Sequence, residues 1–213
     1  MSQYKYLHKM FFISRTDMQL DEGFWMRWSD NYGRTFDGGR VVIPVRKNKK
    51  VTIFNEDILK FDESSLSKNK IIVFGNLPYN ISTEILSTWI TNLKDDYWFS
   101  NLILMFQKEV ADRIIAQFNT SAYGRLSILA NWRLNINKIC DISPESFSPR
   151  PKIQSSLIHF TPKKDFAEIK DPINLEKITR IFFSQRRKML KKPFNQVFHG
   201  NVEILKKLDI DLN

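Results

Sequence analysis

The feature that most constrains the fold is a short apolar run that ends in a polar and aromatic tetrapeptide. Residues 71–74 carry four apolar side chains in succession, and Asn76-Leu77-Pro78-Tyr79 follows after a single glycine. A run without polar alternation is typical of a strand that is buried on both faces, as in a parallel sheet covered by helices. Ligands of open α/β sheets bind at the carboxyl ends of such strands. The tetrapeptide is therefore predicted to lie in a binding cleft.

The chemistry of this tetrapeptide suits a nucleobase. The side-chain amide of Asn76 and the carbonyl of Pro78 can each accept an N–H hydrogen bond, and the ring of Tyr79 offers an aromatic face. A flat heteroaromatic ring with an exocyclic amino group would use all of these groups. The alternative interpretation of Asn76 and Tyr79 is a tight turn after the strand.

Charge and cysteine content narrow the class of protein. A net charge of +10 favours a polyanionic partner, with nucleic acid the first candidate, although a lysine-rich proteome would give the same excess. Cys140 is the only cysteine, which excludes an internal disulfide and fits a reducing cytosol. The sequence has neither a membrane-length apolar run nor a secretory signal, and His8, His159 and His199 are too scattered for a metal site. We therefore expect a cytoplasmic, monomeric chain without a metal.

Two dissimilar stretches meet near residue 47. The first 46 residues are rich in aromatic and turn residues and predict a β-hairpin with strands near residues 24–28 and 41–43. Beyond them, strands and helices alternate, which is typical of a doubly wound α/β sheet. The predicted strands are residues 51–54, 71–74, 102–106 and 155–160, and the predicted helices are one capped by Ser82, then residues 108–117, 174–190 and 202–208.

Five sequence blocks follow one another over residues 50–190. They are VFGNLPYNIS at 73–82, MFQKEV at 105–110, YGRLS at 123–127, FSPRPKIQSS at 147–156 and FSQRRK at 183–188. In order and spacing these blocks resemble the ribosomal RNA small-subunit adenine N6-dimethyltransferases of the bacterial KsgA type. The resemblance implies transfer of two methyl groups from S-adenosylmethionine to the N6 amines of adenines in small-subunit ribosomal RNA, a step of ribosome biogenesis.

The resemblance also implies catalytic residues, namely Asn76, Leu77, Pro78, Tyr79 and Phe147. An adenine amine is a poor nucleophile because its lone pair is delocalised into the ring. Acceptors at Asn76 and Pro78 would hold the amine in a pyramidal geometry and in line with a sulfonium methyl group. The target base must leave its stack, and Tyr79 and Phe147 would then clamp it. A core position is the alternative interpretation of Phe147.

Cofactor and RNA contacts are implied in the same way. The family pattern places the cofactor against Asp57, Ile58 and Asn76, with Asp57 accepting a hydrogen bond from the cofactor's adenine amino group. A turn aspartate is the alternative for Asp57. The basic residues near the end of the long helix are expected to contact RNA phosphates, although a solvated face is the alternative. These residues are Arg186, Arg187, Lys188, Lys191 and Lys192. For Tyr123 and Arg125, a role in stabilising the fold is at least as well supported as a functional one.

The chain departs from the family at both ends. The family's glycine-rich G-x-G-x-G cofactor turn is absent, and residues 29–36 instead weakly resemble a sialidase Asp-box, with Asn31 replacing an aspartate. The expected architecture is an incomplete Rossmann-like S-adenosylmethionine methyltransferase sheet. It would comprise a foreign hairpin segment at 1–46, a partial α/β domain at 47–162 and a truncated helical RNA-binding part at 163–213.

Three hypotheses of function remain open at this point. The first is a ribosomal RNA adenine dimethyltransferase, whose activity the missing cofactor loop would impair. The second is a catalytically inactive RNA-binding fragment of the same family, which would differ by failing to bind S-adenosylmethionine. The third is a sialidase-like fragment, which requires further Asp-boxes, and the sequence has no second one.

Overall fold

The structure is a computed structural model that forms two compact units. One unit contains Met1–Ser14 and Asp62–Asn213, and the other is Arg15–Phe61. In the second unit, β2 (Phe24–Trp25) pairs antiparallel with β3 (Val42–Ile43), at the positions where the sequence places the strands of a hairpin. The predicted strand at 51–54 lies outside the described residues, and the domain boundaries at 47 and 163 stay predictions. The structure describes residues 10–13, 24–25, 42–43, 57–93, 96–147, 150–184 and 190–212.

The first unit is built on a five-stranded sheet with the order β1-β4-β5-β7-β6. Strands β1, β4 and β5 run parallel, whereas β7 is antiparallel to β5, and β6 is antiparallel to β7. The α/β fold class is confirmed, but the sheet is mixed, and β1 and β6 are strands that the sequence did not reveal. The bounds are β1 (Met10–Ile13), β4 (Ile71–Asn76), β5 (Phe99–Gln107), β6 (Leu134–Ile142) and β7 (Ser155–Pro162).

Strand β4 is an interior strand of the sheet, as its apolar run predicts. It pairs with β1 on one side and with β5 on the other, so its backbone polar groups are satisfied within the sheet. The side chains of Ile71 and Val73 are buried, and those of Ile72 and Phe74 are half-buried on the opposite face. Burial on both faces explains why the run lacks the polar alternation of a surface strand.

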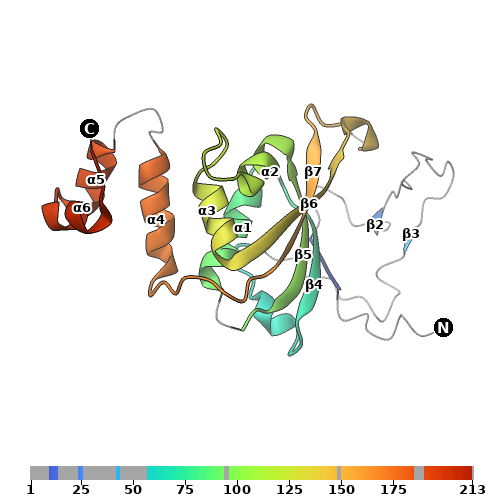
Figure 1. Cartoon of the computed structure of the whole chain (residues 1–213). Helices are drawn as coiled ribbons and strands as arrows, with labels where there is room; N and C mark the ends of the chain where they lie inside the picture. The colour runs from blue at the N-terminus through green and yellow to red at the C-terminus, as the bar shows by residue number, and fades with distance from the viewer. Residues whose placement is uncertain are drawn as a thin grey trace. The chain divides into compact units, whose positions relative to one another are not determined.

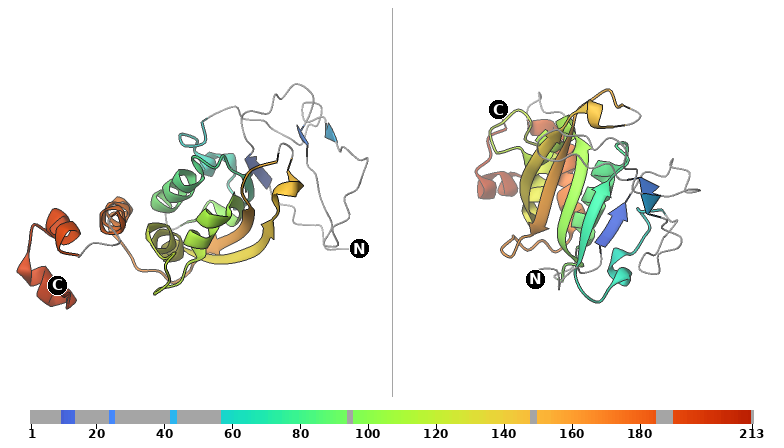
Figure 2. Two further views of the ribbon diagram at one scale, coloured as in Figure 1. Left: turned by 90° about the horizontal axis from the view of Figure 1, so that it is seen from above. Right: turned by 90° about the vertical axis from the view of Figure 1, so that its right-hand side faces the viewer.

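Three helices pack on one face of this sheet, as Figures 1 and 2 show. They are α1 (Ser82–Asn92), α2 (Lys108–Ile115) and α3 (Arg125–Arg133). Helix α1 buries Ile85, Leu86, Trp89 and Ile90, which are the residues that its periodicity predicts. The predicted cap is wrong by one residue: Ser82 is the first helical residue, and Ile81 occupies the cap position.

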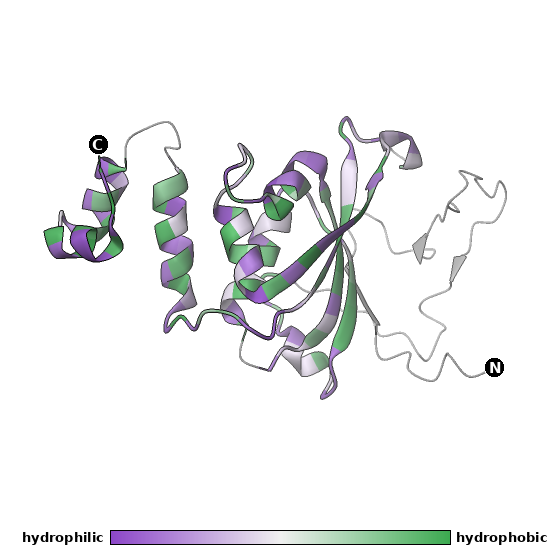
Figure 3. Ribbon diagram, viewed as in Figure 1, coloured by the Kyte–Doolittle hydropathy of each residue, from purple (hydrophilic) through white to green (hydrophobic). Residues whose placement is uncertain are grey.

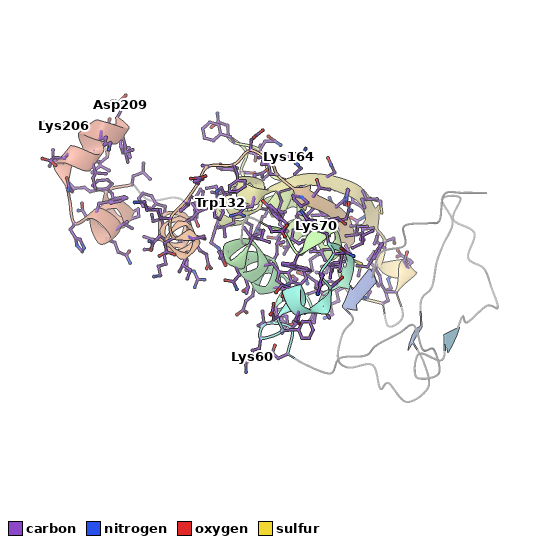
Figure 4. All side chains as sticks on the ribbon, turned by 90° about the horizontal axis from the view of Figure 1, so that it is seen from below. Lys60, Lys70, Trp132, Lys164, Lys206 and Asp209 are labelled. Atoms are coloured by element: carbon purple, nitrogen blue, oxygen red, sulfur yellow. The ribbon has the colours of Figure 1, made fainter. Side chains whose placement is uncertain are left out.

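The core lies between the sheet and these helices. In Figure 3, hydrophobic residues run along the strands and the helices packed on them, and Figure 4 shows the side chains of the described residues on the same ribbon. Trp89 Nε1 donates a hydrogen bond of 2.6 Å to Glu63 in the short helix η2 (Glu63–Leu66), which attaches that turn to α1. Burial raises the pKa of Glu63. The largest fully buried side chains include Phe99, Phe106, Phe160 and Phe194.

The C-terminal part is helical, as predicted, but is divided differently. Helix α4 (Pro172–Phe183) contacts α1 and α3, and it is followed by α5 (Lys191–Phe198) and α6 (Val202–Leu208). The prediction of one helix over 174–190 is wrong, because α4 ends at Phe183. The backbone N–H and the hydroxyl of Ser184 both donate to the Ile181 carbonyl, which closes the last turn. No helix among the described residues is long and apolar enough to cross a membrane.

Candidate functional site: the carboxyl edge of the sheet

Segments that are far apart in the sequence meet at the carboxyl edge of the parallel strands. Asn76, the last residue of β4, pairs with Met105 of β5, and Gln107 at the end of β5 pairs with Ser155. Because β7 is antiparallel to β5, its first residue lies beside the last residue of β5. Ser155 also pairs with Ile142 at the end of β6, so the connection between β6 and β7 lies at the same edge.

The tetrapeptide after β4 is anchored by one buried side chain. Leu77 is fully buried, whereas Asn76 is exposed and Pro78 and Tyr79 are half-buried. Leu77 therefore acts as an anchor, and its neighbours are left accessible at the sheet edge. Gly75 makes this packing possible, because a Cβ at that position would lie 2.7 Å from Leu104 Cδ2 and 3.1 Å from Leu77 Cδ2.

Backbone hydrogen bonds fix the conformation of the same loop. The N–H of Ile81 donates to the Pro78 carbonyl at 3.1 Å, and the hydroxyl of Ser82 donates to the Tyr79 carbonyl at 3.2 Å. This is the tight turn named as the alternative interpretation. A carbonyl oxygen can accept two hydrogen bonds, so the bond from Ile81 does not preclude a second one from a ligand. The turn and the binding role are therefore compatible.

The ring of Tyr79 is held from a distant part of the chain. Its hydroxyl shares a hydrogen bond of 2.8 Å with the hydroxyl of Ser155, which is fully buried. The two residues are 76 positions apart in the sequence, so no local pattern could reveal the contact. This bond ties the loop after β4 to the start of β7.

Phe147 lies on the loop that enters β7. It follows the short helix η3 (Pro144–Ser146), its N–H donates to the Pro144 carbonyl at 3.2 Å, and its side chain is half-buried. The other end of this loop is tied down, because the N–H of Lys108 donates to the Gln154 carbonyl at 2.9 Å. The structure therefore attaches the loop of Phe147 to the start of α2, which follows β5 directly.

A charged cluster flanks this edge, and the sequence did not predict it. Asp141 accepts hydrogen bonds from Lys138 at 2.8 Å and from the buried hydroxyl of Ser156 at 2.6 Å. Its carboxylate also lies 3.6 Å from Lys108 Nζ. The bonds from Lys138 and Ser156 lower the pKa of Asp141 to about 2. A hydrogen bond to Asp112 raises the pKa of Lys108, so both groups stay charged at neutral pH.

The predicted cofactor residues Asp57 and Ile58 belong to the Arg15–Phe61 unit. Asp57 Oδ1 accepts a hydrogen bond of 3.1 Å from the N–H of Leu59, and its Oδ2 lies 3.8 Å from Lys60 Nζ. This is the geometry of the turn aspartate given as its alternative. The side chain of Asp57 is half exposed, and a carboxylate has acceptor sites beyond these two contacts. An exposed carboxylate can accept a hydrogen bond from an adenine amino group, and the half-buried Ile58 offers an apolar surface to a ring.

The predicted RNA contacts are only partly described. Arg186, Arg187 and Lys188 lie outside the described residues. Lys191 and Lys192 open helix α5, and both are exposed. Within the described ranges, no group of three His, Cys, Asp or Glu side chains could hold a metal ion.

The contacts of Tyr123 and Arg125 support the interpretation that they stabilise the fold. Arg125 Nη1 lies 2.9 Å from Glu176 Oε1 on α4, and the ring of Tyr123 packs edge-on against Phe183. The N–H of Gly124 donates to the hydroxyl of Ser127 at the start of α3. The contacts of Arg125 and Tyr123 attach α4 to the start of α3, whereas the Gly124 bond is local to α3.

Comparison with known proteins gives one consistent family. The family model for ribosomal RNA adenine dimethylase matches residues 42–213. A ribosomal RNA small subunit methyltransferase A from Pelagibacter ubique is 64% identical over 173 residues, which cover 81% of this chain and 66% of that protein. The corresponding protein of Zymomonas mobilis is 41% identical over 147 residues, covering 69% and 52%. The chain thus spans about half to two thirds of the length of these curated relatives.

Among solved structures, a dimethyladenosine transferase from Plasmodium falciparum has the same fold. The TM-score is 0.56 at 24% sequence identity, and the match covers 79% of this chain and 61% of that one. This likeness supports the Rossmann-like architecture of the sheet and its helices.

Proposed function

Because this chain belongs to the ribosomal RNA adenine dimethylase family, we propose that it performs S-adenosylmethionine-dependent N6-methylation of adenines in small-subunit ribosomal RNA. The observation that carries the proposal is the anchored tetrapeptide at the carboxyl edge of β4. There Leu77 is buried, and the exposed Asn76 and the half-buried Pro78 and Tyr79 are its neighbours in the chain.

The proposed roles follow from the chemistry of each group. The amide oxygen of Asn76 and the Pro78 carbonyl accept the two N–H bonds of the target amine. Holding both protons away from the ring plane turns the nitrogen lone pair towards the electrophile, and fixed orientation supplies much of the rate. Tyr79 and Phe147 clamp the unstacked base between aromatic faces. Leu77 contributes by its burial, since it fixes the backbone on which its neighbours sit.

The cofactor supplies a methyl group on a positively charged sulfur. In this proposal Asp57, Ile58 and Asn76 hold it, with the carboxylate of Asp57 accepting a hydrogen bond from its adenine amino group. The basic residues around the start of α5 hold the RNA backbone through charge, without reading its sequence. They are Arg186, Arg187, Lys188, Lys191 and Lys192.

A catalytically inactive RNA-binding member of the family is the second candidate function. One observation favours it: the chain has seven glycines, and no set of them has the G-x-G-x-G spacing of the family's cofactor turn. Titration with S-adenosylmethionine separates the two functions. Micromolar affinity supports the enzyme, and no binding up to millimolar concentration supports the inactive protein.

The role of Asn76 gives the sharpest test of the enzyme. Asn76→Ala is expected to lower methyl transfer to small-subunit ribosomal RNA by at least about 100-fold, because one acceptor for the developing charge is lost. The affinity for the same RNA should change by less than about twofold, since the base contributes little beside the phosphates. The measurement is incorporation of labelled methyl groups together with RNA binding.

Asn92→Ala is the matched control, because Asn92 is an exposed asparagine at the end of α1. It should behave as the wild type in both assays. Full activity in the Asn76→Ala variant would exclude the proposed role of its amide.

A further inference from the structure

We propose that Ser155 is a positioning residue for the adenine site, which holds the ring of Tyr79 in place before a base arrives. The inference rests on the proposed function, because it assigns to Tyr79 the aromatic face on which the base stacks. Ser155 does not contact the base in this proposal. It acts through the hydrogen bond of 2.8 Å between its hydroxyl and the phenol of Tyr79.

The ring of Tyr79 is constrained at both of its ends. At the backbone end, Leu77 is buried two residues earlier, and the Tyr79 carbonyl accepts a hydrogen bond from the hydroxyl of Ser82. At the far end, the phenol oxygen is bonded to Ser155. A side chain held at both ends has lost its rotational freedom about the Cα–Cβ bond, so the long axis of the ring is fixed. Rotation about the Cβ–ring bond leaves the phenol oxygen in place, but the phenol O–H prefers the plane of the ring, so the hydrogen bond to Ser155 also favours one tilt of the aromatic face. The position of the ring is then set by the protein and not by the ligand.

Ser155 is suited to this task because it is itself immobile. Its side chain is fully buried, and its backbone is paired with Gln107 of β5 on one side and Ile142 of β6 on the other. A buried hydroxyl requires a hydrogen-bond partner, and Tyr79 provides one. A ligand that meets a ring already in place removes less side-chain entropy on binding, and this raises its affinity.

The same bond connects the two halves of the proposed aromatic clamp. Phe147 lies on the loop that leads into Ser155, and the end of that loop is fixed by the hydrogen bond from the Lys108 N–H to the Gln154 carbonyl. The Tyr79–Ser155 contact therefore joins the segment that carries one aromatic residue to the segment that carries the other. The spacing between the rings of Tyr79 and Phe147 therefore depends on the hydrogen bond between Tyr79 and Ser155.

The test is a double-mutant cycle with a cofactor-free optical readout. The probe is a uridine octamer with 2-aminopurine at its centre, whose fluorescence is quenched when the base stacks on an aromatic ring. Ser155→Ala and Tyr79→Phe should each weaken probe binding by about tenfold and reduce the quenching at saturation, because the hydrogen bond is lost and the ring is retained. The double variant should be no weaker than either single variant, since the two changes remove one shared bond.

Ser156→Ala is the matched control. Ser156 is the next residue and is equally buried, but its hydroxyl donates to Asp141 and not to Tyr79. It should bind and quench the probe as the wild type does, and circular dichroism with urea unfolding shows whether each variant is folded.

The outcomes separate the inference from the function on which it rests. Normal quenching by Ser155→Ala, or additive losses in the double variant, would overturn the positioning role alone. If the Ser155→Ala and Ser156→Ala variants lose probe affinity and quenching equally, Ser155 only stabilises the fold and does not position Tyr79. A wild-type chain that leaves the probe unquenched would overturn adenine binding itself, and the positioning role with it.

Discussion

At the scale of single residues, Gly75 is the position on which the tetrapeptide depends most directly. It is the last residue but one of β4, and its missing side chain leaves the space that Leu77 and Leu104 fill. Both leucines are fully buried, so neither can move aside without disturbing the core. The accessible positions of Asn76 and Tyr79 therefore follow from the absence of one methyl group.

Gly75→Ala is accordingly expected to lower the free energy of unfolding by about 1–3 kcal/mol, the usual cost of overpacking. Urea unfolding followed by circular dichroism measures the change. Gly124→Ala is the comparison, because a Cβ at that position makes only an ordinary contact of 3.6 Å with Phe183. An equal loss in both variants would mean that space at Gly75 is not the limiting factor.

The sequence revealed the residues of this site that belong to one contiguous block, and missed those that do not. Asn76 and Tyr79 follow a recognisable strand within a few positions. Ser155 and Asp141 act through partners that are 76 and 15 positions away, and no spacing pattern encodes a contact between strands that pair only in the folded sheet. The sequence included the buried Ser155 and Ser156 in the block at 147–156 but indicated no role for either.

At the scale of elements, a helix or strand could be predicted from the sequence only where its apolar side chains are buried in a regular pattern. Helix α1 was predicted from its apolar face, because that face packs on the sheet. The end of α4 was not, because helix-forming residues continue past Phe183 and the chain stops the helix by bonds from Ser184 to Ile181. Strand β6 was missed because most of its side chains are exposed, so it has no buried apolar run.

The edge formed by β6 and β7 should make stability depend on pH. The pKa of Asp141 is lowered to about 2 in the folded chain, from 3.8. A lowered pKa stabilises the fold above the unfolded value, and this contribution is lost as the pH falls from about 4 to about 2. We expect Asp141→Asn to cost on the order of 1 kcal/mol at pH 7, since the cluster is partly exposed.

The measurement is urea unfolding of both chains from pH 7 to pH 2. The difference between wild type and Asp141→Asn should shrink across the lower part of that range. A difference that is constant with pH would mean that the carboxylate charge of Asp141 does not stabilise the fold.

At the scale of the whole molecule, the net charge of +10 favours association with a polyanion such as the proposed RNA. If the basic segment at residues 186–192 contacts phosphates, replacing Arg186, Arg187 and Lys188 by glutamine should weaken binding to ribosomal RNA. It should also flatten the dependence of log K on log salt, by about 0.7–0.9 for each phosphate that is no longer neutralised. The salt dependence of binding is measured between about 50 and 200 mM, the range over which such charges act.

Lys206→Gln with Lys207→Gln is the control for overall charge. Both lysines are exposed on α6, and replacing them lowers the net charge without touching the basic segment. The slope of log K against log salt is compared between the two variants. An equal fall per removed charge in both would indicate that RNA is attracted by the charge of the whole molecule and not by a defined contact.

The path of β7 has a consequence for how this family can diversify. Its reversed direction delivers the 143–154 connection, a hairpin loop between neighbouring strands, to the rim where the other strands finish. A loop of that kind can be lengthened, shortened or exchanged with a relative's while every strand keeps its neighbours. If Phe147 contacts the base as proposed, substrate selectivity can therefore evolve by exchange of this loop alone, independently of the sheet that supports it.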